Sequence, residues 1–383
     1  MRASAGTVLR EWGRLGCIGF GGPPTHIALL RDLCVARRAW LSDREFEDAI
    51  AACNLLPGPA STQLAIFCAW RVRGALGAVI GGLGFVVPGL VAMLALAAVF
   101  LAGSPPEWIR GAGAGGGAAV AAVAVHAGAS LVPGSYRRVR GAARVRWAVY
   151  LGLGVLAAAT VGPWLVLLLV ACGAFEVALR RMGDGRDVAA LHGWPALAAV
   201  AATTTGGLGA VAWVALKVGA LSYGGGFVIV PLMQGDAVDR YGWMTDGQFL
   251  NAVALGQVTP GPVIHTVTAV GYAAAGIGGG LLAAAVAFAP SFLFVLLGAR
   301  RFDDLRANPD VRAFLDGAGP AAIGAILGSA VVLAAALTEA WQFAVLAGAA
   351  VLLLVARRGV VLTLLLAGAV GVVVALAGGP VPR

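Results

Sequence analysis

Of the 383 residues, 60% are hydrophobic and only 12% are charged, whereas a soluble globular domain carries about a quarter of its residues as Asp, Glu, Lys and Arg. This composition excludes a soluble globular protein. The formal net charge of +9 would suggest nucleic-acid binding in a soluble domain, but the arginines cluster in short loops between apolar runs, where they act as orientation signals. We therefore expect a membrane protein without a nucleic-acid partner.

Long apolar runs predict the membrane-spanning helices. Residues 74–103 and 111–134 contain no Asp, Glu, Lys or Arg, and a helix needs about 20 such residues to cross a hydrocarbon layer of ~30 Å. We predict an all-α integral membrane protein with five crossings in each half, at residues 8–30, 76–102, 111–133, 147–162, 163–180, 205–230, 276–299, 318–338, 340–356 and 359–379.

An internal repeat divides the chain. Residues 20–63 align without a gap on residues 223–266, at an offset of 203. Matching glycines and alanines mean little in this composition, but the alignment also pairs Trp40 with Trp243, Asp43 with Asp246, and one Pro-Gly-Pro motif with another. We predict an N-terminal repeat over 1–180, a linker over 181–204 and a C-terminal repeat over 205–383, a common plan for secondary transporters.

The distribution of arginine predicts that the two repeats are inverted. The loop 31–44 holds four arginines, while its counterpart 234–247 holds one. The next pair reverses this, with one arginine in 103–112 and four in 300–312. Because Lys and Arg accumulate in cytoplasmic loops, equivalent loops are expected on opposite sides of the membrane.

The segment around Pro57-Gly58-Pro59 is predicted to be a re-entrant or broken helical hairpin. Basic residues precede it in the loop 31–44 and follow it at Arg71 and Arg73, and a single crossing would place one group outside. Proline cannot continue the helical hydrogen bonds, and glycine adds freedom. The resulting count of crossings places the N-terminus outside, in conflict with the basic residues Arg2, Arg10 and Arg14.

Two interruptions occur once in each half, and we predict a substrate site where they meet. An interrupted helix exposes backbone N–H groups and a partial positive charge at each helix N-terminus, which suits an anion. Neutral amides and hydroxyls flank both Pro-Gly-Pro motifs and can donate further hydrogen bonds. The predicted substrate-binding residues are Gly21, Gly22, Pro23, Asn54, Pro57, Gly58, Pro59, Thr62, Gln63, Gly224, Gly225, Gly226, Gln257, Thr259, Pro260, Gly261 and Pro262.

Structural roles compete with these assignments. Small residues also permit close helix packing in membranes, and polar side chains beside prolines can bond the carbonyls that the break frees. His26 and His265 are candidates for proton coupling or for structural hydrogen bonds. Arg31 and Arg37 are candidates for gating or for interface anchors. No zinc-protease, Walker A or G-x-S-x-G motif is present, so we expect no catalytic residues, metal or cofactor.

The motifs that begin at Phe20 (FGGPPTHI), Arg37 (RRAWL), Asn54 (NLLPGP), Gly224 (GGGF) and Gly256 (GQVTPGP) together resemble the chromate ion transporter (CHR) family. The resemblance covers about residues 8–300. It implies a bacterial or archaeal inner-membrane carrier of two inverted domains that exports chromate, confers chromate resistance and interacts with sulfate. Val258 replaces the family's usual leucine, which removes no polar group.

The resemblance leaves alternatives open. Another oxyanion such as sulfate could be the substrate, and a channel would need a continuous pore instead of a closed site. An enzyme would need paired acids or a nucleophile and base within the spans, where few carboxylates occur. The lipid bilayer and, as an option left open, a second copy of the chain are the other expected partners.

Overall fold

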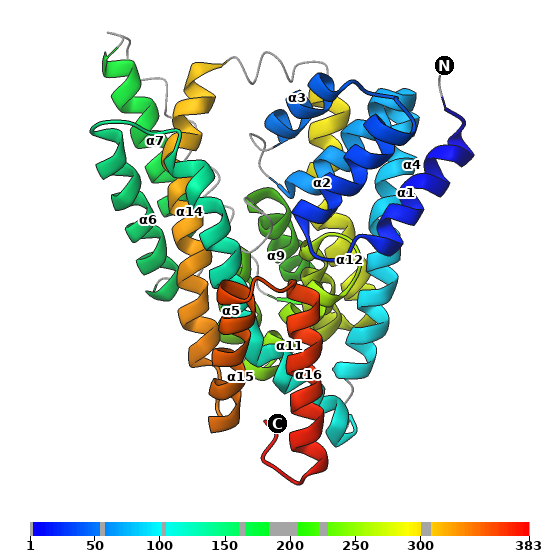
Figure 1. Cartoon of the computed structure of the whole chain (residues 1–383), viewed down its shortest axis with the longest axis vertical. Coiled ribbons are helices and arrows are strands. Elements are labelled where there is room, and N and C mark those ends of the chain that lie inside the picture. Colours follow the sequence, from blue (N-terminus) through cyan, green and yellow to red (C-terminus); the bar gives the residue numbers. More distant parts are fainter. Residues whose placement is uncertain are drawn as a thin grey trace.

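In the computed structural model, the described part of the chain comprises residues 3–53, 58–101, 105–160, 165–183, 206–222, 229–299 and 308–382. Within these ranges the regular structure is helical and no strand occurs, which confirms the predicted all-α class. Figure 1 shows the helices in two groups that diverge toward one end of the long axis. The N-terminus lies near that end and the C-terminus near the other.

The helices follow the apolar runs of the sequence. In the first half they are α1 (Ala5–Ile18), α2 (Pro23–Arg31) with the π-helical extension η1 (Asp32–Arg37), α3 (Asp43–Cys53), α4 (Ala60–Phe100), α5 (Glu107–Tyr136), α6 (Ala143–Thr160) and α7 (Leu165–Gly183). In the second half they are α9 (Gly207–Leu221), α10 (Ile229–Gln234) with η4 (Gly235–Arg240), α11 (Asp246–Val258), η5 (Val263–His265), α12 (Thr266–Gly298), α14 (Pro309–Ala335), α15 (Ala340–Ala350) with η7 (Val351–Val355), and α16 (Val360–Leu376).

Four of the described helices are long and apolar enough to cross a membrane: α4, α5, η5 with α12, and α14. Large apolar side chains point outward on this surface, for example Leu297, which is 77% exposed, and Leu366, which is 46% exposed. In water such a surface would be unfavourable, whereas lipid tails are as apolar as leucine. The protein is a multi-pass membrane protein.

Backbone features recur at the spacing of the predicted repeat. The π-helical turns of residues 32–37 and 235–240 are 203 residues apart. A tryptophan follows each turn, and its backbone N–H donates a 2.8 Å hydrogen bond to a carbonyl within the turn, from Trp40 to Cys34 and from Trp243 to Ala237. Figure 1 places α3 toward the end of the long axis where the N-terminus lies, and α11 farther toward the other end. The inverted orientation in a membrane stays a prediction.

The helix α4 contains a reversal of the chain. Gly74 has a φ of +67°, and a β-carbon on Gly77 would collide with the carbonyl of Ala69. In a continuous helix, residues eight apart lie about 12 Å apart along the axis, so α4 folds back on itself at Gly74. The same reversal occurs in α12 at Gly276, where φ is +61°.

The short arm of α4 ends beside the start of α3. Arg71 on this arm forms an ion pair with Glu45 in the first turn of α3. Because α3 ends at Cys53 and α4 begins at Ala60, the chain enters along α3, turns through the segment that contains Pro59, and returns along the short arm. The helix α3 and the short arm of α4 are therefore the two arms of a hairpin, with Gly58 and Pro59 at the start of the returning arm.

The segment that we predicted as one crossing over residues 8–30 also doubles back. The rings of Trp12 and Trp40 are stacked with centroids 6.0 Å apart, and Arg38 forms an ion pair with Glu11. A straight helix would separate residues 12 and 40 by about 42 Å. The predicted single crossing is therefore wrong, because the chain reverses after α1.

This second hairpin also corrects the predicted position of the N-terminus. Arg73 donates a 2.7 Å hydrogen bond to the carbonyl of Ala3. The start of α1 therefore lies beside the basic residues at the end of the short arm of α4. The conflict between the crossing count and the N-terminal arginines arose from treating residues 8–30 as one span.

The two halves interlock. The helix α14 packs against α6 and α7, and α5 packs against α15 and α16. Figure 1 shows α14 beside α6 and α7, and α5 close to α15 and α16. Small residues allow this close approach: a β-carbon added to Gly317 would collide with the carbonyl of Cys172, and one added to Gly371 with that of Gly111. Each half of the sequence thus supplies one helix that packs between helices of the other half. Close packing through small residues is common in membrane proteins.

Candidate functional site

The described residues include three of the four predicted interruptions. Between α1 and α2, Gly21 and Gly22 have φ values of +97° and +77°. In the two Pro-Gly-Pro motifs, Gly58 and Gly261 have φ values of +119° and +93°. Side chains with a β-carbon rarely adopt such angles. The predicted residues Asn54, Pro57, Gly224, Gly225 and Gly226 lie outside the described residues.

Interruptions from opposite halves of the sequence meet. The N–H of Gly261 donates a 2.9 Å hydrogen bond to the carbonyl of Gly19, and a β-carbon on Gly22 would lie 3.8 Å from Val263. Near the other motif, a β-carbon on Gly58 would lie 3.3 Å from the carbonyl of Gly219. Interruptions from both halves of the sequence therefore share one region.

His26 links three segments of this region. Its Nε2 atom lies 2.9 Å from the carbonyl oxygen of Gly19, which can only accept, so Nε2 carries the proton and donates. Nδ1 then accepts from the hydroxyl of Ser61, 3.2 Å away on the first turn of α4. The carbonyl of Gly19 thus receives hydrogen bonds from His26 and Gly261 together. Both ring nitrogens serve to hold the interruption after α1.

His265 is fully buried at the other Pro-Gly-Pro motif. The centroid of its ring lies 4.9 Å from that of Phe288, and the backbone of Val86 on α4 is within hydrogen-bonding reach of the imidazole. A β-carbon added to Gly89 would lie 2.8 Å from this ring and would collide with the carbonyl of Pro260. Glycine at position 89 therefore lets the long arm of α4 reach the motif.

Buried polar atoms without a protein partner gather near the interruptions. A buried polar group normally makes a hydrogen bond, and each exception in a native structure asks for an explanation. Gln63 is also fully buried, with its side-chain nitrogen 2.6 Å from the position of a β-carbon on Gly58. Among the described residues, the unpartnered hydroxyl or amide atoms that lie close in sequence or space to the interruptions belong to Thr62, Ser222, Gln257, Thr259, Thr268 and Ser291.

Sequence analysis missed part of this group. Ser291 follows Pro290 on the long arm of α12, and its hydroxyl oxygen lies 3.6 Å from the β-carbon position of Gly58. Ser222 lies two residues before the second glycine run, which begins at Gly224. The position of Ser222 beside that run could have been read from the sequence, whereas Ser291 reaches the site only through the packing of α12.

Arg31 and Arg37 lie away from the interruptions. Arg31 forms ion pairs of 2.9 Å with Asp43 and 2.7 Å with Glu47, and Arg37 forms one of 2.7 Å with Asp32. These side chains are exposed, at the end of the hairpins opposite their tips. The structure does not bring them to the predicted site, and their gating role stays a prediction.

A buried ion pair that we did not predict joins α9 to η4. Lys217 pairs with Asp236, and their side chains are only 12% and 1% exposed. The equivalent residues of the first half are Arg14, which is exposed, and Leu33, which is buried, so this pair has no counterpart there. Ionisable residues inside membrane segments are costly and commonly functional.

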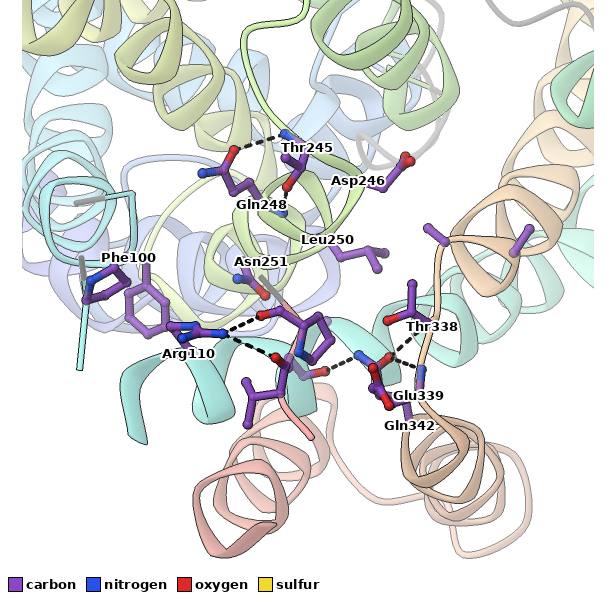
Figure 2. A pocket seen from close by; sticks show the side chains of 18 residues that line it. Phe100, Arg110, Thr245, Asp246, Gln248, Leu250, Asn251, Thr338, Glu339 and Gln342 are labelled. Atoms are coloured by element: carbon purple, nitrogen blue, oxygen red, sulfur yellow. Dashed lines mark hydrogen bonds between the residues drawn. The ribbon is translucent and has the colours of Figure 1, made fainter. Parts of the chain in front are cut away.

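An open pocket of about 910 Å³ lies apart from the interruptions. Figure 2 shows Arg110 of α5, Asn251 of α11 and Gln342 of α15 around it. The C-terminal residues Val381 and Pro382 complete its lining. Polar and charged side chains, among them Thr245, Asp246 and Glu339, form part of its wall.

Comparison with known proteins decides the family. The family model described as "Chromate transporter" matches residues 6–176 and 209–372. The chain belongs to the chromate transporter family.

Relatives from several organisms match most of this chain. It is 33% identical over 329 residues to a "Chromate transport protein" of Cupriavidus metallidurans, covering 84% of this chain and 80% of the relative. It is 32% identical over 329 residues to a "Probable chromate transport protein" of Synechococcus elongatus, covering 84% and 82%. It is 32% identical over 341 residues to a "Chromate transport protein" of Pseudomonas aeruginosa, covering 85% and 80%. No solved structure matches.

Proposed function

We propose that this protein is a secondary transporter that exports chromate, or a sulfate-like oxyanion, and thereby confers chromate resistance. The anion would be held midway across the membrane, where the interruptions of the two halves meet. The observation that carries the proposal is the group of buried polar atoms without partners at these interruptions. A bound oxyanion would accept the hydrogen bonds that the protein does not.

The helices supply a matching electrostatic field. The helices α2, α4 and α12 all begin beside interruptions, at Pro23, Ala60 and Thr266, so their N-terminal N–H groups and partial positive charges lie there. Such helix N-termini bind anions without a lysine or arginine. None of the predicted or unpartnered residues named above at the interruptions is a lysine or an arginine, so neutral donors are the groups available.

The membrane potential favours the proposed direction. Moving one elementary charge across the membrane is worth about 2.3 kcal/mol per 100 mV. A dianion that leaves a negative-inside cell gains roughly twice that amount, so export needs little additional driving force. Import of the same ion would require co-transported protons or cations.

The decisive experiment is uptake of labelled chromate into inverted membrane vesicles, with sulfate and molybdate as competitors. Inversion turns export into uptake, which can be counted directly. We expect uptake above that of vesicles without the protein, and competition by anions of the same shape and charge. Absence of chromate uptake together with uptake of labelled sulfate would assign sulfate as the substrate.

Asn54 and Gln257 occupy equivalent positions before the two Pro-Gly-Pro motifs, and Gln257→Ala or Asn54→Ala is expected to weaken transport. A hydrogen bond to a charged group is worth about 1.5–3 kcal/mol, so the KM for chromate should rise by about tenfold to a hundredfold. The KM is measured from initial uptake rates at increasing chromate concentrations. Ser130→Ala, which removes an exposed hydroxyl of α5, is the control, and unchanged kinetics in both site variants would return these amides to a structural role.

A further inference from the structure

A cluster of exposed arginines lies where α5 ends and α6 begins. This cluster, here called the basic patch, consists of Arg137, Arg138, Arg140 and Arg144. Among the described residues, none of the four forms an ion pair. The loop 31–44 differs, because its arginines Arg31, Arg37 and Arg38 all pair with carboxylates. The basic patch therefore presents guanidinium groups that the protein itself does not neutralise.

The carboxylates at this end of the molecule do not cancel the charge of the patch. Glu176 accepts hydrogen bonds of 2.6 and 3.3 Å from Arg146, and Asp310 pairs with two arginines of α7. Asp316 lies within electrostatic range of Arg138 and of an arginine on α14. Eight arginines and only these three carboxylates occur in residues 137–146, 176–183 and 309–316, an excess of five positive charges.

An exposed apolar stripe on α6 begins directly beside the patch. The stripe consists of Val145, Val149, Leu153 and Leu156. Their spacing of three or four residues places them on one face of the helix. Figure 1 shows α6 at the outer edge of its group of helices, so this face meets lipid tails. The patch, at the start of the same helix, therefore lies at the depth of lipid headgroups.

Aromatic contacts hold the patch in place. The guanidinium of Arg144 lies 5.1 Å from the centroid of the Tyr136 ring, which packs edge-on against Trp147 with centroids 5.1 Å apart. The indole N–H of Trp147 donates a 2.9 Å hydrogen bond to the hydroxyl of Ser135. Tyrosine and tryptophan are enriched at the boundary between membrane and water. These contacts join the end of α5 to the start of α6, so the turn that carries the arginines is ordered before a ligand arrives.

We propose that the basic patch binds the headgroups of anionic phospholipids, whose acyl chains lie along the stripe on α6. The planar fork of donors on a guanidinium matches the oxygens of a phosphate group. An arginine near an anionic membrane surface raises affinity by about fivefold. Orienting the chain in the membrane does not require unpaired arginines, as the loop 31–44 shows. The inference goes beyond the proposed function and does not depend on which ion is transported.

The test measures lipid binding to the purified full chain in a neutral detergent by native mass spectrometry. Phosphatidylglycerol and phosphatidylcholine with identical acyl chains are titrated separately, and the Kd of the first lipid bound is determined. We expect phosphatidylglycerol to bind at least about tenfold more tightly. The triple variant Arg137→Gln, Arg140→Gln and Arg144→Gln should lose about tenfold or more of this affinity, while its affinity for phosphatidylcholine should stay the same.

The matched control removes the same charge from exposed arginines that are paired. It is the triple variant Arg31→Gln, Arg37→Gln and Arg71→Gln, whose three arginines contact carboxylates. This control should bind phosphatidylglycerol like the parent. Equal losses in the two triple variants would reduce the effect to net charge and overturn the proposed site. Parental affinity in the variant of the basic patch would overturn it as well.

Two further measurements complete the test. Glycerol 3-phosphate carries the phosphate without acyl chains and should not displace phosphatidylglycerol at equal concentration; displacement there would assign the patch to soluble phosphates and overturn the lipid as its ligand. The melting temperature of each variant shows whether it is folded. If the triple variant of the patch is not, Arg137→Gln with Arg140→Gln replaces it, since neither guanidinium has a partner among the described residues. This double variant should still lose affinity for phosphatidylglycerol by about tenfold, and parental affinity would overturn the proposal.

Discussion

Replacing Gly89 by valine is expected to abolish most transport while the protein still inserts into the membrane. The new side chain would begin 2.8 Å from the ring of His265 and would collide with the carbonyl of Pro260. Overpacking of this kind costs about 1–3 kcal/mol, and the easiest relief is to push the second Pro-Gly-Pro motif away from Gly19. Because each 1.4 kcal/mol is about tenfold in an equilibrium, chromate uptake should fall by about fivefold to a hundredfold.

The measurement is the initial rate of uptake into inverted vesicles, normalised to the amount of folded protein. Gly278→Val is the matched control, because a β-carbon at Gly278 would meet nothing within 4 Å. This control should transport at the parental rate. If Gly89→Val also transports normally, the close approach of α4 to the second motif is unimportant for function, and the proposed site would have to lie elsewhere.

The second large effect concerns the buried pair of Lys217 and Asp236. Lys217→Met should destabilise the protein strongly, because it leaves a buried carboxylate without its cation, and one oxygen of Asp236 already lacks a partner among the described residues. Breaking a buried pair from one side costs about 3–5 kcal/mol. The melting temperature in detergent should therefore fall clearly below that of the parent.

The double variant Lys217→Met with Asp236→Leu should recover most of that loss. Leucine is the residue that the first half carries at the equivalent position, Leu33, where it is buried. Replacing a buried pair by apolar side chains is often neutral or stabilising. A double variant as unstable as the single one would show that the pair contributes net stability. A stable double variant that no longer transports would instead give the pair a role in the transport cycle.

Much of this fold could be predicted from local sequence signals. The repeat was visible because Trp40 and Trp243 keep their places among otherwise variable residues, and both end the same kind of π-helical turn. The reversal at residues 19–22 was missed for a physical reason. Hydropathy reports how apolar a segment is, but not whether the chain continues or returns after a glycine pair, and here the return is fixed by contacts 27 and 28 residues apart in sequence.

In the candidate site, too, local sequence patterns could be predicted and contacts between distant segments could not. Pro-Gly-Pro motifs and the amides beside them are local patterns, so Gln257, Thr259 and His265 could be named in advance. Gly89 and Ser291 could not, because they reach the site only through the long arms of α4 and α12 after the reversals at Gly74 and Gly276. The pair of Lys217 and Asp236 was missed because its residues belong to separate helices on either side of an interruption.

The interlocking of the halves has a consequence for how such a chain can be divided. A polypeptide cut between α7 and α9 would yield two pieces, each with a glycine-lined helix, α5 or α14, whose groove is filled by the other piece. Neither fragment alone could cover these grooves with its own side chains. Severed halves should therefore regain a native assembly only when both are synthesised together in one membrane.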